Sequence, residues 1–188
     1  YHMHGRVWYD AELEILNQHL KLGDTVIDVG ANMGFISGIA SKLVGQNGQV
    51  HSFEPSPVVY GKLMGVIREN SLANITPYNL GCGDVPGEMM LASPTASSGN
   101  ATLTSPELAA GTRQRVQIVR MDDFFAGRLE RLDFIKIDTE GFEDHVLVGA
   151  TRLIDDYQPT IYIELAAEYS DSSQRSIQWL RDHGYVFE

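Results

Sequence analysis

The chain has 188 residues, which predicts one domain, 1–188, with a core of its own. Its formal net charge of −11 excludes a general nucleic-acid binder, because such a protein needs a basic face. No apolar run could span a bilayer, and the N-terminus has no signal-peptide pattern. Cys82 is the only cysteine, which excludes an internal disulfide and fits a reducing compartment, so we expect a cytoplasmic location.

The N-terminal stretch predicts a helix, because Leu13, Leu16 and Leu20 recur on one face at helical spacing. Gly23 follows and is typical of a helix end. We expect this cap helix, within residues 1–22, to cover the sheet or the mouth of a ligand site.

Residues 25–35 predict a buried strand, a glycine turn and the start of a helix. The β-branched, apolar residues Val26, Ile27 and Val29 suit a strand of a parallel sheet. Glycines in the turn that follows let the chain approach a bound molecule closely. Such units bind nucleotide-like ligands in open α/β sheets. Behind the turn, apolar residues recur at helical spacing: Phe35, Ile36, Ile39, Ala40 and Leu43.

The pattern of this turn favours a ligand other than a dinucleotide. Gly30 and Gly34 are separated by three residues and do not fit the fingerprint G-x-G-x-x-G. Asp28, just before the turn, suits a cationic amine better than the pyrophosphate that usually sits at a helix start. S-adenosylmethionine carries a nucleoside at one end and an ammonium group at the other. We therefore predict it as the ligand of Asp28, Gly30, Ala31, Asn32, Gly34 and Phe35, the alternative being a tight turn without a ligand.

The second predicted strand, Val50–Phe53, ends in Glu54 and Pro55. Glu54 lies about 20 residues after the glycine turn, where such folds place the acid that binds the ribose hydroxyls. We therefore predict ribose binding at Glu54 and Pro55, the alternative being a surface acid at a strand end. A helix that starts with Pro57 follows, and its buried stripe is Val59, Leu63, Val66 and Ile67.

A third predicted strand, Ile75–Leu80, is followed by small residues at 81–84. Gly81 and Cys82 would let the flat edge of an adenine approach the backbone, although a plain glycine turn explains them equally well. For the side chain of Cys82 we expect a small buried apolar residue rather than a nucleophile.

Two strand-like runs, Glu88–Ala92 and Arg115–Val119, flank a stretch with no core of its own. Ser, Thr, Gly and Pro make up ten of the fourteen residues from Ser93 to Pro106. We predict a flexible loop over residues 93–113, either a binding lid or a disordered segment.

A second dense stretch begins near Leu132. Phe134–Ile137 predict a buried strand beside the first strand, and Asp138 follows its end. Acids surround the start of the next helix, where the helix dipole favours them without any function. They are Glu140, Glu143 and Asp144. One helix follows, with the apolar stripe Val146, Leu147, Ala150, Leu153 and Ile154.

The next predicted strand, Thr160–Ile163, again ends in an acid, Glu164. A final helix, Ser170–His183, stops at Gly184, and Tyr185–Phe187 start one more strand. Parallel strands bring their carboxyl ends to one edge, where open sheets bind their ligands. We therefore expect four acids at that edge: Asp28, Glu54, Asp138 and Glu164.

Three motifs together resemble the FkbM family of S-adenosylmethionine-dependent methyltransferases: Asp28–Gly34, Phe53–Pro57 and Asp133–Glu143. The resemblance extends from about Leu13 to Glu164. It implies a Rossmann-like α/β fold of the class I methyltransferase type, an open and mostly parallel sheet with helices on both faces. It also implies methylation of hydroxyl groups, often on sugars or small natural products. For single residues it implies cofactor contact by the turn Gly30–Gly34, ribose binding by Glu54, and an active-site edge around Asp138 and Glu140.

The C-terminal edge departs from this family. Sheets of this type usually end in an antiparallel hairpin, whereas this chain stops as the first strand of such a hairpin begins. The chain would then be truncated or unusual at this edge. An unpaired edge is a template for pairing with a second subunit, so a homo-oligomer is one expectation.

Methyl transfer requires the acceptor oxygen, the methyl carbon and the sulfur in a line, and a hydroxyl acceptor must lose its proton. We predict that Asp138 lies near the methyl group and that Glu140 and Glu164 orient or deprotonate the acceptor. Two or three of these acids could instead hold a divalent cation. His145 could serve as the base, although we expect it to face solvent.

Two other classes of function stay open at this point. A nicotinamide-dependent oxidoreductase has a similar sheet, but the turn lacks the middle glycine of its fingerprint. A non-catalytic module that binds the cofactor and assembles with a partner is the third interpretation. Titration with NAD and with S-adenosylhomocysteine separates the first two, and a sizing column with an activity assay discriminates the third.

Overall fold

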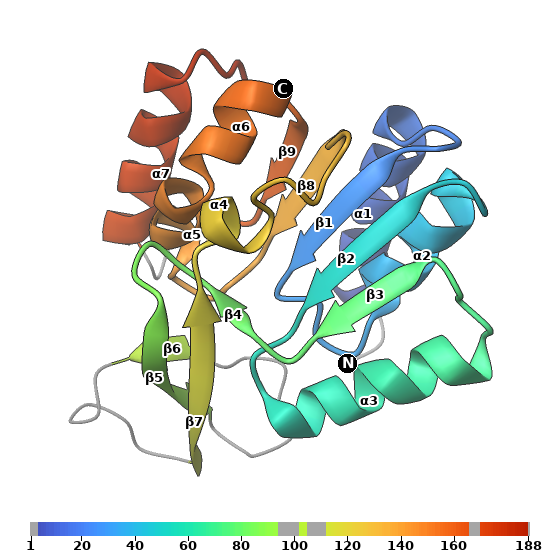
Figure 1. Cartoon of the computed structure of the whole chain (residues 1–188), viewed down its shortest axis with the longest axis horizontal. Coiled ribbons are helices and arrows are strands. Elements are labelled where there is room, and N and C mark those ends of the chain that lie inside the picture. The colour runs from blue at the N-terminus through green and yellow to red at the C-terminus, as the bar shows by residue number, and fades with distance from the viewer. Residues whose placement is uncertain (1–3, 94–101, 105–111, 166–169, 188) are drawn as a thin grey trace.

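The computed structural model describes residues 4–93, 102–104, 112–165 and 170–187. Its main sheet has five parallel strands in the order β3-β2-β1-β8-β9 (Figure 1). This confirms the predicted open, mostly parallel sheet. The strands are β1 (Thr25–Val29), β2 (Gln49–Phe53), β3 (Ile75–Tyr78), β8 (Phe134–Ile137) and β9 (Thr160–Ile163).

Helices cover both faces of this sheet, as predicted (Figure 1). On one face lie α1 (His4–His19) and α2 (Phe35–Val44), with α3 (Pro57–Glu69) beside β3. Among the described residues, no helix is long and apolar enough to cross a membrane. The other face carries α4 (Met121–Phe124), α5 (Glu143–Gly149), α6 (Thr151–Tyr157) and α7 (Ser170–Asp182).

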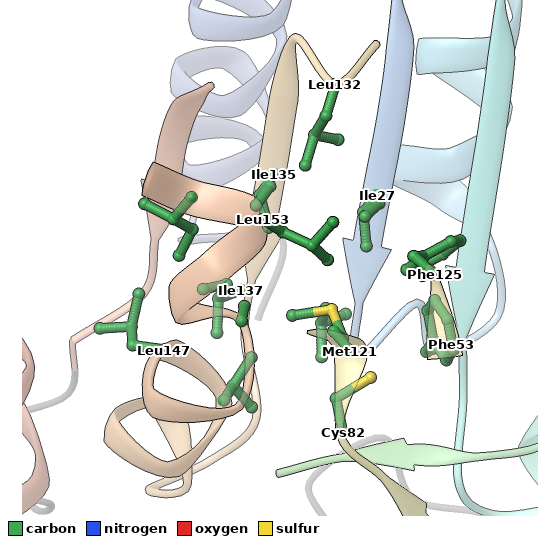
Figure 2. Packing of buried hydrophobic residues seen from close by; sticks show 14 of the residues in the cluster. Ile27, Phe53, Cys82, Met121, Phe125, Leu132, Ile135, Ile137, Leu147 and Leu153 are labelled. Atoms are coloured by element: carbon green, nitrogen blue, oxygen red, sulfur yellow. The ribbon is translucent and has the colours of Figure 1, made fainter. Parts of the chain in front are cut away.

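The central strands are buried on both faces because helices lie on each side. In β1, Val26 packs into the cluster under α1 and α2, whereas Ile27 and Val29 pack into the cluster under α4 to α7. This second cluster also contains Cys82 (Figure 2). Burial raises the pKa of the Cys82 thiol, so it is the buried apolar residue that we predicted, not a nucleophile.

A second, four-stranded sheet was not predicted. Its strands follow the order β4-β7-β5-β6, and β5 pairs antiparallel with both β6 and β7. It lies on the side toward which β1, β2 and β3 point (Figure 1). Leu91, Val116 and Ile118 form its small core. Its strands are β4 (Gly81–Cys82), β5 (Gly87–Ser93), β6 (Thr102–Thr104) and β7 (Thr112–Val119).

This sheet corrects the prediction of a loop over residues 93–113. β6 and the ends of β5 and β7 fall inside that range, and the remainder, 94–101 and 105–111, lies outside the described residues. β6 is short and rich in threonine, and it pairs with β5. Composition alone does not reveal such a pairing.

Three smaller predictions were also wrong. The third strand ends at Tyr78, because the chain then leaves the main sheet to form β4. The helix predicted after residue 143 is interrupted at Ala150 and forms α5 and α6, although its apolar stripe is buried as expected. Residues 185–187 form no strand, and the Tyr185 hydroxyl instead donates to the carbonyl oxygen of Pro159 at 2.9 Å.

The homo-oligomer that we expected from an unpaired sheet edge stays a prediction.

Candidate active site

The turns after β1 and β8 meet at the point where the strand order reverses. The N–H of Asp138 donates to the carbonyl oxygen of Val29 at 3.1 Å. A Cβ atom on Gly30 would overlap the carbonyl oxygen of Asp138, so the two turns touch through their backbones. Ligands of open α/β sheets bind at such a switch point, beyond the carboxyl ends of the strands.

The glycine turn has the tight geometry that the sequence predicted. Gly30, Asn32 and Gly34 have φ values of 77°, 52° and 88°, a region that favours glycine and tolerates asparagine. The N–H groups of Gly30 and Ala31 both donate to the carbonyl oxygen of Phe53, which ties the turn to the end of β2. Phe35, which follows the turn, is about half exposed at 49%.

The side chain of Glu54, which follows β2, binds the backbone of this turn. One of its carboxylate oxygens accepts the N–H of Asn32 at 3.0 Å, and the other accepts the N–H of Ser56 at 2.8 Å. Burial raises the pKa of Glu54 to about 7, even though these two N–H groups and Lys136 oppose the shift. The predicted alternative of a surface acid is therefore wrong, because Glu54 is buried.

Asp28 has a different partner from the one that we expected. Its side chain is 0% exposed and cannot touch a ligand ammonium in this arrangement. Instead, one oxygen lies 3.5 Å from the Lys136 ammonium and the other accepts the Ser37 hydroxyl at 2.5 Å. The amine that we assigned to a ligand is thus supplied by the neighbouring strand β8.

Asp138 and Glu164 stand at the ends of β8 and β9, as predicted. One Asp138 oxygen is 3.2 Å from the Lys136 ammonium. Desolvation, together with the negative charges of Asp138 and Glu140, raises the pKa of Glu164 to about 7. Glu140, in the turn that follows β8, has a left-handed φ of 53°. Asp138, Glu140 and Glu164 are therefore close enough to interact electrostatically.

Glu143 gives this turn its shape and needs no role in chemistry. One of its oxygens accepts the N–H groups of Thr139 and Gly141, at 3.1 and 3.0 Å, and the Thr139 hydroxyl at 3.0 Å. The acid at the helix start thus holds the backbone around Glu140. This agrees with the structural interpretation that we gave for acids at this helix.

Two residues near this edge were missed by sequence reasoning. Lys136 is buried between apolar neighbours in β8, directly opposite Asp28 in the parallel register. Glu12 of α1 lies close enough to Tyr162 and Lys136 to interact with them, and desolvation raises its pKa. A lysine at an inward position of a buried strand was a readable signal for Lys136. No local pattern marks Glu12, because its partners lie more than one hundred residues further along the chain.

Gly81 and Cys82, predicted to lie beside an adenine, belong to β4. A Cβ atom on Gly81 would lie 3.5 Å from Pro55, so these predicted residues adjoin each other. The side chain of His145 is 40% exposed, so it faces solvent in part. Its Nδ1 lies 2.9 Å from Asp84, and its ring stacks on Phe142. Among the residues that the structure describes, no group of acids and histidines has the arrangement of a metal site, so the divalent cation is unsupported.

Comparisons with known proteins agree with this geometry. A family model described as "Methyltransferase FkbM domain" matches residues 28–187. The methyltransferase FkbM structure from Methylobacillus flagellatus has a TM-score of 0.61 at 18% identity, over 91% of this chain and 44% of that chain. This chain thus spans less than half the length of that protein. No curated protein has a sequence similar to that of the chain.

Two further solved structures share the fold. Precorrin-6y C5,15-methyltransferase from Geobacter metallireducens has a TM-score of 0.58 at 18% identity, over 95% of this chain and 70% of that chain. Aeropyrum pernix fibrillarin, with natively bound S-adenosyl-L-methionine, has a TM-score of 0.53 at 16% identity, over 89% of this chain and 60% of that chain. At these identities the likeness shows the fold alone, which is that of a class I methyltransferase.

Proposed function

Because the chain belongs to the methyltransferase FkbM domain family, we propose that it transfers a methyl group from S-adenosylmethionine to a hydroxyl group of a small acceptor. The observation that carries this proposal is the meeting of two turns at the switch point of the sheet. A glycine turn, a carboxylate that follows β2 and a carboxylate that follows β8 come together there. We expect the acceptor to be a sugar or a small natural product, as the family resemblance implies.

The residues on the cofactor side fit S-adenosylmethionine. Each oxygen of Glu54 already accepts one backbone N–H and has capacity for a second hydrogen bond. The carboxylate can therefore receive both ribose hydroxyls, and we expect the adenine beside Gly81 and Cys82. The Gly30–Gly34 turn supplies close backbone approach to the rest of the molecule. Since Asp28 is buried, we assign it to holding Lys136 rather than to contact with the methionine amine.

The charge of the site favours S-adenosylmethionine over NAD. Glu54, Asp138 and Glu164 line the edge, and the only lysine close to them, Lys136, is already paired with two carboxylates. The pyrophosphate of NAD would bring two negative charges to these acids. S-adenosylmethionine brings a sulfonium and an ammonium, which they attract. This argues against the oxidoreductase alternative.

On the acceptor side, the acids would orient and deprotonate the hydroxyl. S-adenosylmethionine supplies an electrophilic methyl group, which leaves the sulfur as the acceptor oxygen bonds to it. Asp138 would hold the acceptor hydroxyl in line, and Glu164 would take its proton. A pKa of about 7 suits this second task, because the carboxylate is partly ionised near neutral pH and can accept a proton. Glu140 lies close enough to Glu164 to influence its charge.

Replacing Asp138 by asparagine should reduce methyl transfer by on the order of 10²-fold, because the amide cannot carry the charge that orients the acceptor. The measurement is transfer of labelled methyl to a panel of sugar and phenolic acceptors. Asp156→Asn, at an exposed position on α6, is the matched control and should leave the rate unchanged. Equal rates for Asp138→Asn and the wild type would remove Asp138 from the chemistry.

Calorimetry with S-adenosylhomocysteine and with NAD tests the cofactor separately from the acceptor. We expect saturable binding of S-adenosylhomocysteine and no heat with NAD. Binding without transfer to any acceptor in the panel would favour the non-catalytic module. Binding of NAD alone would contradict the proposal.

A further inference from the structure

The ammonium group of Lys136 is buried where the two turns of the active-site edge meet. Its side chain is 4% exposed, and it is the only buried lysine or arginine among the residues whose burial is described. Burial of an ammonium is costly unless charged and hydrogen-bonding partners surround it. A strand that served only the core would carry an apolar residue at this position, as it does at Ile135 and Ile137.

The three contacts of this ammonium come from both turns. It donates to the carbonyl oxygen of Gly30 at 2.8 Å, and it lies 3.5 Å from Asp28 and 3.2 Å from Asp138. Gly30 begins the cofactor turn, whereas Asp138 begins the turn on the acceptor side. One side chain thus fixes the carbonyl of the first turn and the carboxylate of the second. Burial disfavours the charged form, but Asp28 and Asp138 outweigh it and raise the pKa of Lys136.

The positive charge of Lys136 also acts on groups that it does not touch. Burial raises the pKa of four such groups and the charge of Lys136 opposes that rise: Glu12 of α1, Glu54 after β2, Tyr162 in β9 and Glu164 after β9. Asp28 in β1 and Asp138 after β8 pair with Lys136 directly. Lys136 is therefore a counter-ion shared by the cofactor side and the acceptor side of this edge of the sheet.

We propose that Lys136 is a positioning residue, which holds the Gly30 turn for the cofactor and the Asp138 carboxylate for the acceptor. This inference rests on the proposed function and names a residue that the proposal does not use for contact. It predicts that loss of the ammonium weakens cofactor binding through the turn. It also predicts a change in the pH dependence of binding, through the electrostatic effect on Glu54.

The pH dependence gives a readout that needs no acceptor. Ribose hydroxyls donate to Glu54, so binding favours its ionised form and strengthens as pH rises through about 7. Without Lys136 the pKa of Glu54 rises further, so the midpoint of this dependence should move to higher pH by about half a unit or more. The midpoint shift reports the charge of Lys136 at Glu54, whereas the loss of affinity above the midpoint reports its hold on the Gly30 turn.

The experiment is calorimetric titration of the wild type and of Lys136→Gln with S-adenosylhomocysteine between pH 5.5 and about 9, above and below the pKa of Glu54. We expect about tenfold weaker binding in the variant at pH 7.5, from one lost charged hydrogen bond, together with the upward midpoint shift. Lys42→Met, at an exposed position on α2, is the control and should match the wild type.

Lys136→Gln leaves two carboxylates without their cation and could fail to fold. The double variant Asp28→Asn/Lys136→Met removes both charges of one pair, which proteins often tolerate. Its affinity for S-adenosylhomocysteine should still be lower than that of the wild type, because the Gly30 carbonyl oxygen and the Asp138 carboxylate lose the same ammonium group.

A folded Lys136 variant with the affinity and midpoint of the wild type would overturn the inference. So would failure of both variants to fold, because Lys136 would then act on the fold as a whole. A wild type that binds no S-adenosylhomocysteine would instead overturn the proposed function, and this inference with it.

Discussion

Gly30→Ala is expected to destabilise the protein by about 2–5 kcal/mol and to abolish binding of S-adenosylhomocysteine. Gly30 has a φ of 77°, which an alanine adopts only with strain. The new Cβ atom would also overlap the carbonyl oxygen of Asp138 and lie 3.0 Å from its carbonyl carbon. These are rigid backbone atoms, so the turns after β1 and β8 must move apart. Urea unfolding and calorimetry measure the two effects.

Gly61→Ala is the matched control for this substitution. Gly61 lies within α3, has no positive φ, and a Cβ atom there would meet nothing within 4 Å. Alanine is a better helix former than glycine, so this variant should be more stable than the wild type by up to about 1 kcal/mol. If Gly30→Ala unfolded at the same urea concentration as the wild type, the close approach of the two turns would be refuted.

Glu54→Gln should weaken binding of S-adenosylhomocysteine by about 10- to 100-fold at pH 8, because a neutral amide accepts hydrogen bonds from ribose hydroxyls less strongly. Burial raises the pKa of Glu54 to about 7 in the folded protein. At pH 6 most wild-type molecules therefore carry a protonated Glu54, and the difference between wild type and variant should shrink. Calorimetry at both pH values measures this, and Glu69→Gln, exposed at the end of α3, is the control.

The Glu54 carboxyl gives folding stability the opposite pH dependence to ligand binding: stability falls as pH rises, whereas binding strengthens. Its pKa in the folded protein, about 7, lies above the ordinary value of 4.5, so the folded state binds the proton more tightly than the unfolded chain. The contribution of Glu54 to stability is therefore greatest at low pH and is lost as pH rises from 4.5 to about 7. If Glu54→Gln bound S-adenosylhomocysteine with the affinity and pH dependence of the wild type, Glu54 would not contact the ribose.

The main sheet and its acidic edge were predictable because their signals are local. Apolar β-branched runs mark β1 and β8, and glycines at left-handed φ mark the turn after β1. Parallel strands share one edge, so Glu54, Asp138 and Glu164 could be placed together before any contact was known. The interruption at Ala150 was missed; it lies beside Gly149, whose backbone closely approaches the carbonyl oxygen of Gly83.

The buried charges could not be predicted in the same way. Asp28 was read as a ligand contact because its partner, Lys136, lies more than one hundred residues later and faces it only in the β1–β8 register. Glu12 meets Tyr162 only once α1 has packed on the sheet. The second sheet depends on the pairing of β5 with β6 and with β7, strands that lie apart in the sequence. Each of these features depends on tertiary contacts.

The most direct test of the account is a crystal structure of the protein with S-adenosylhomocysteine. We predict the ribose hydroxyls within hydrogen-bonding distance of Glu54, the adenine beside Gly81, and the sulfur facing Asp138 above the Gly30 turn. A nucleoside bound elsewhere on the protein, or crystals of folded protein that take up none at saturating concentration, would contradict it.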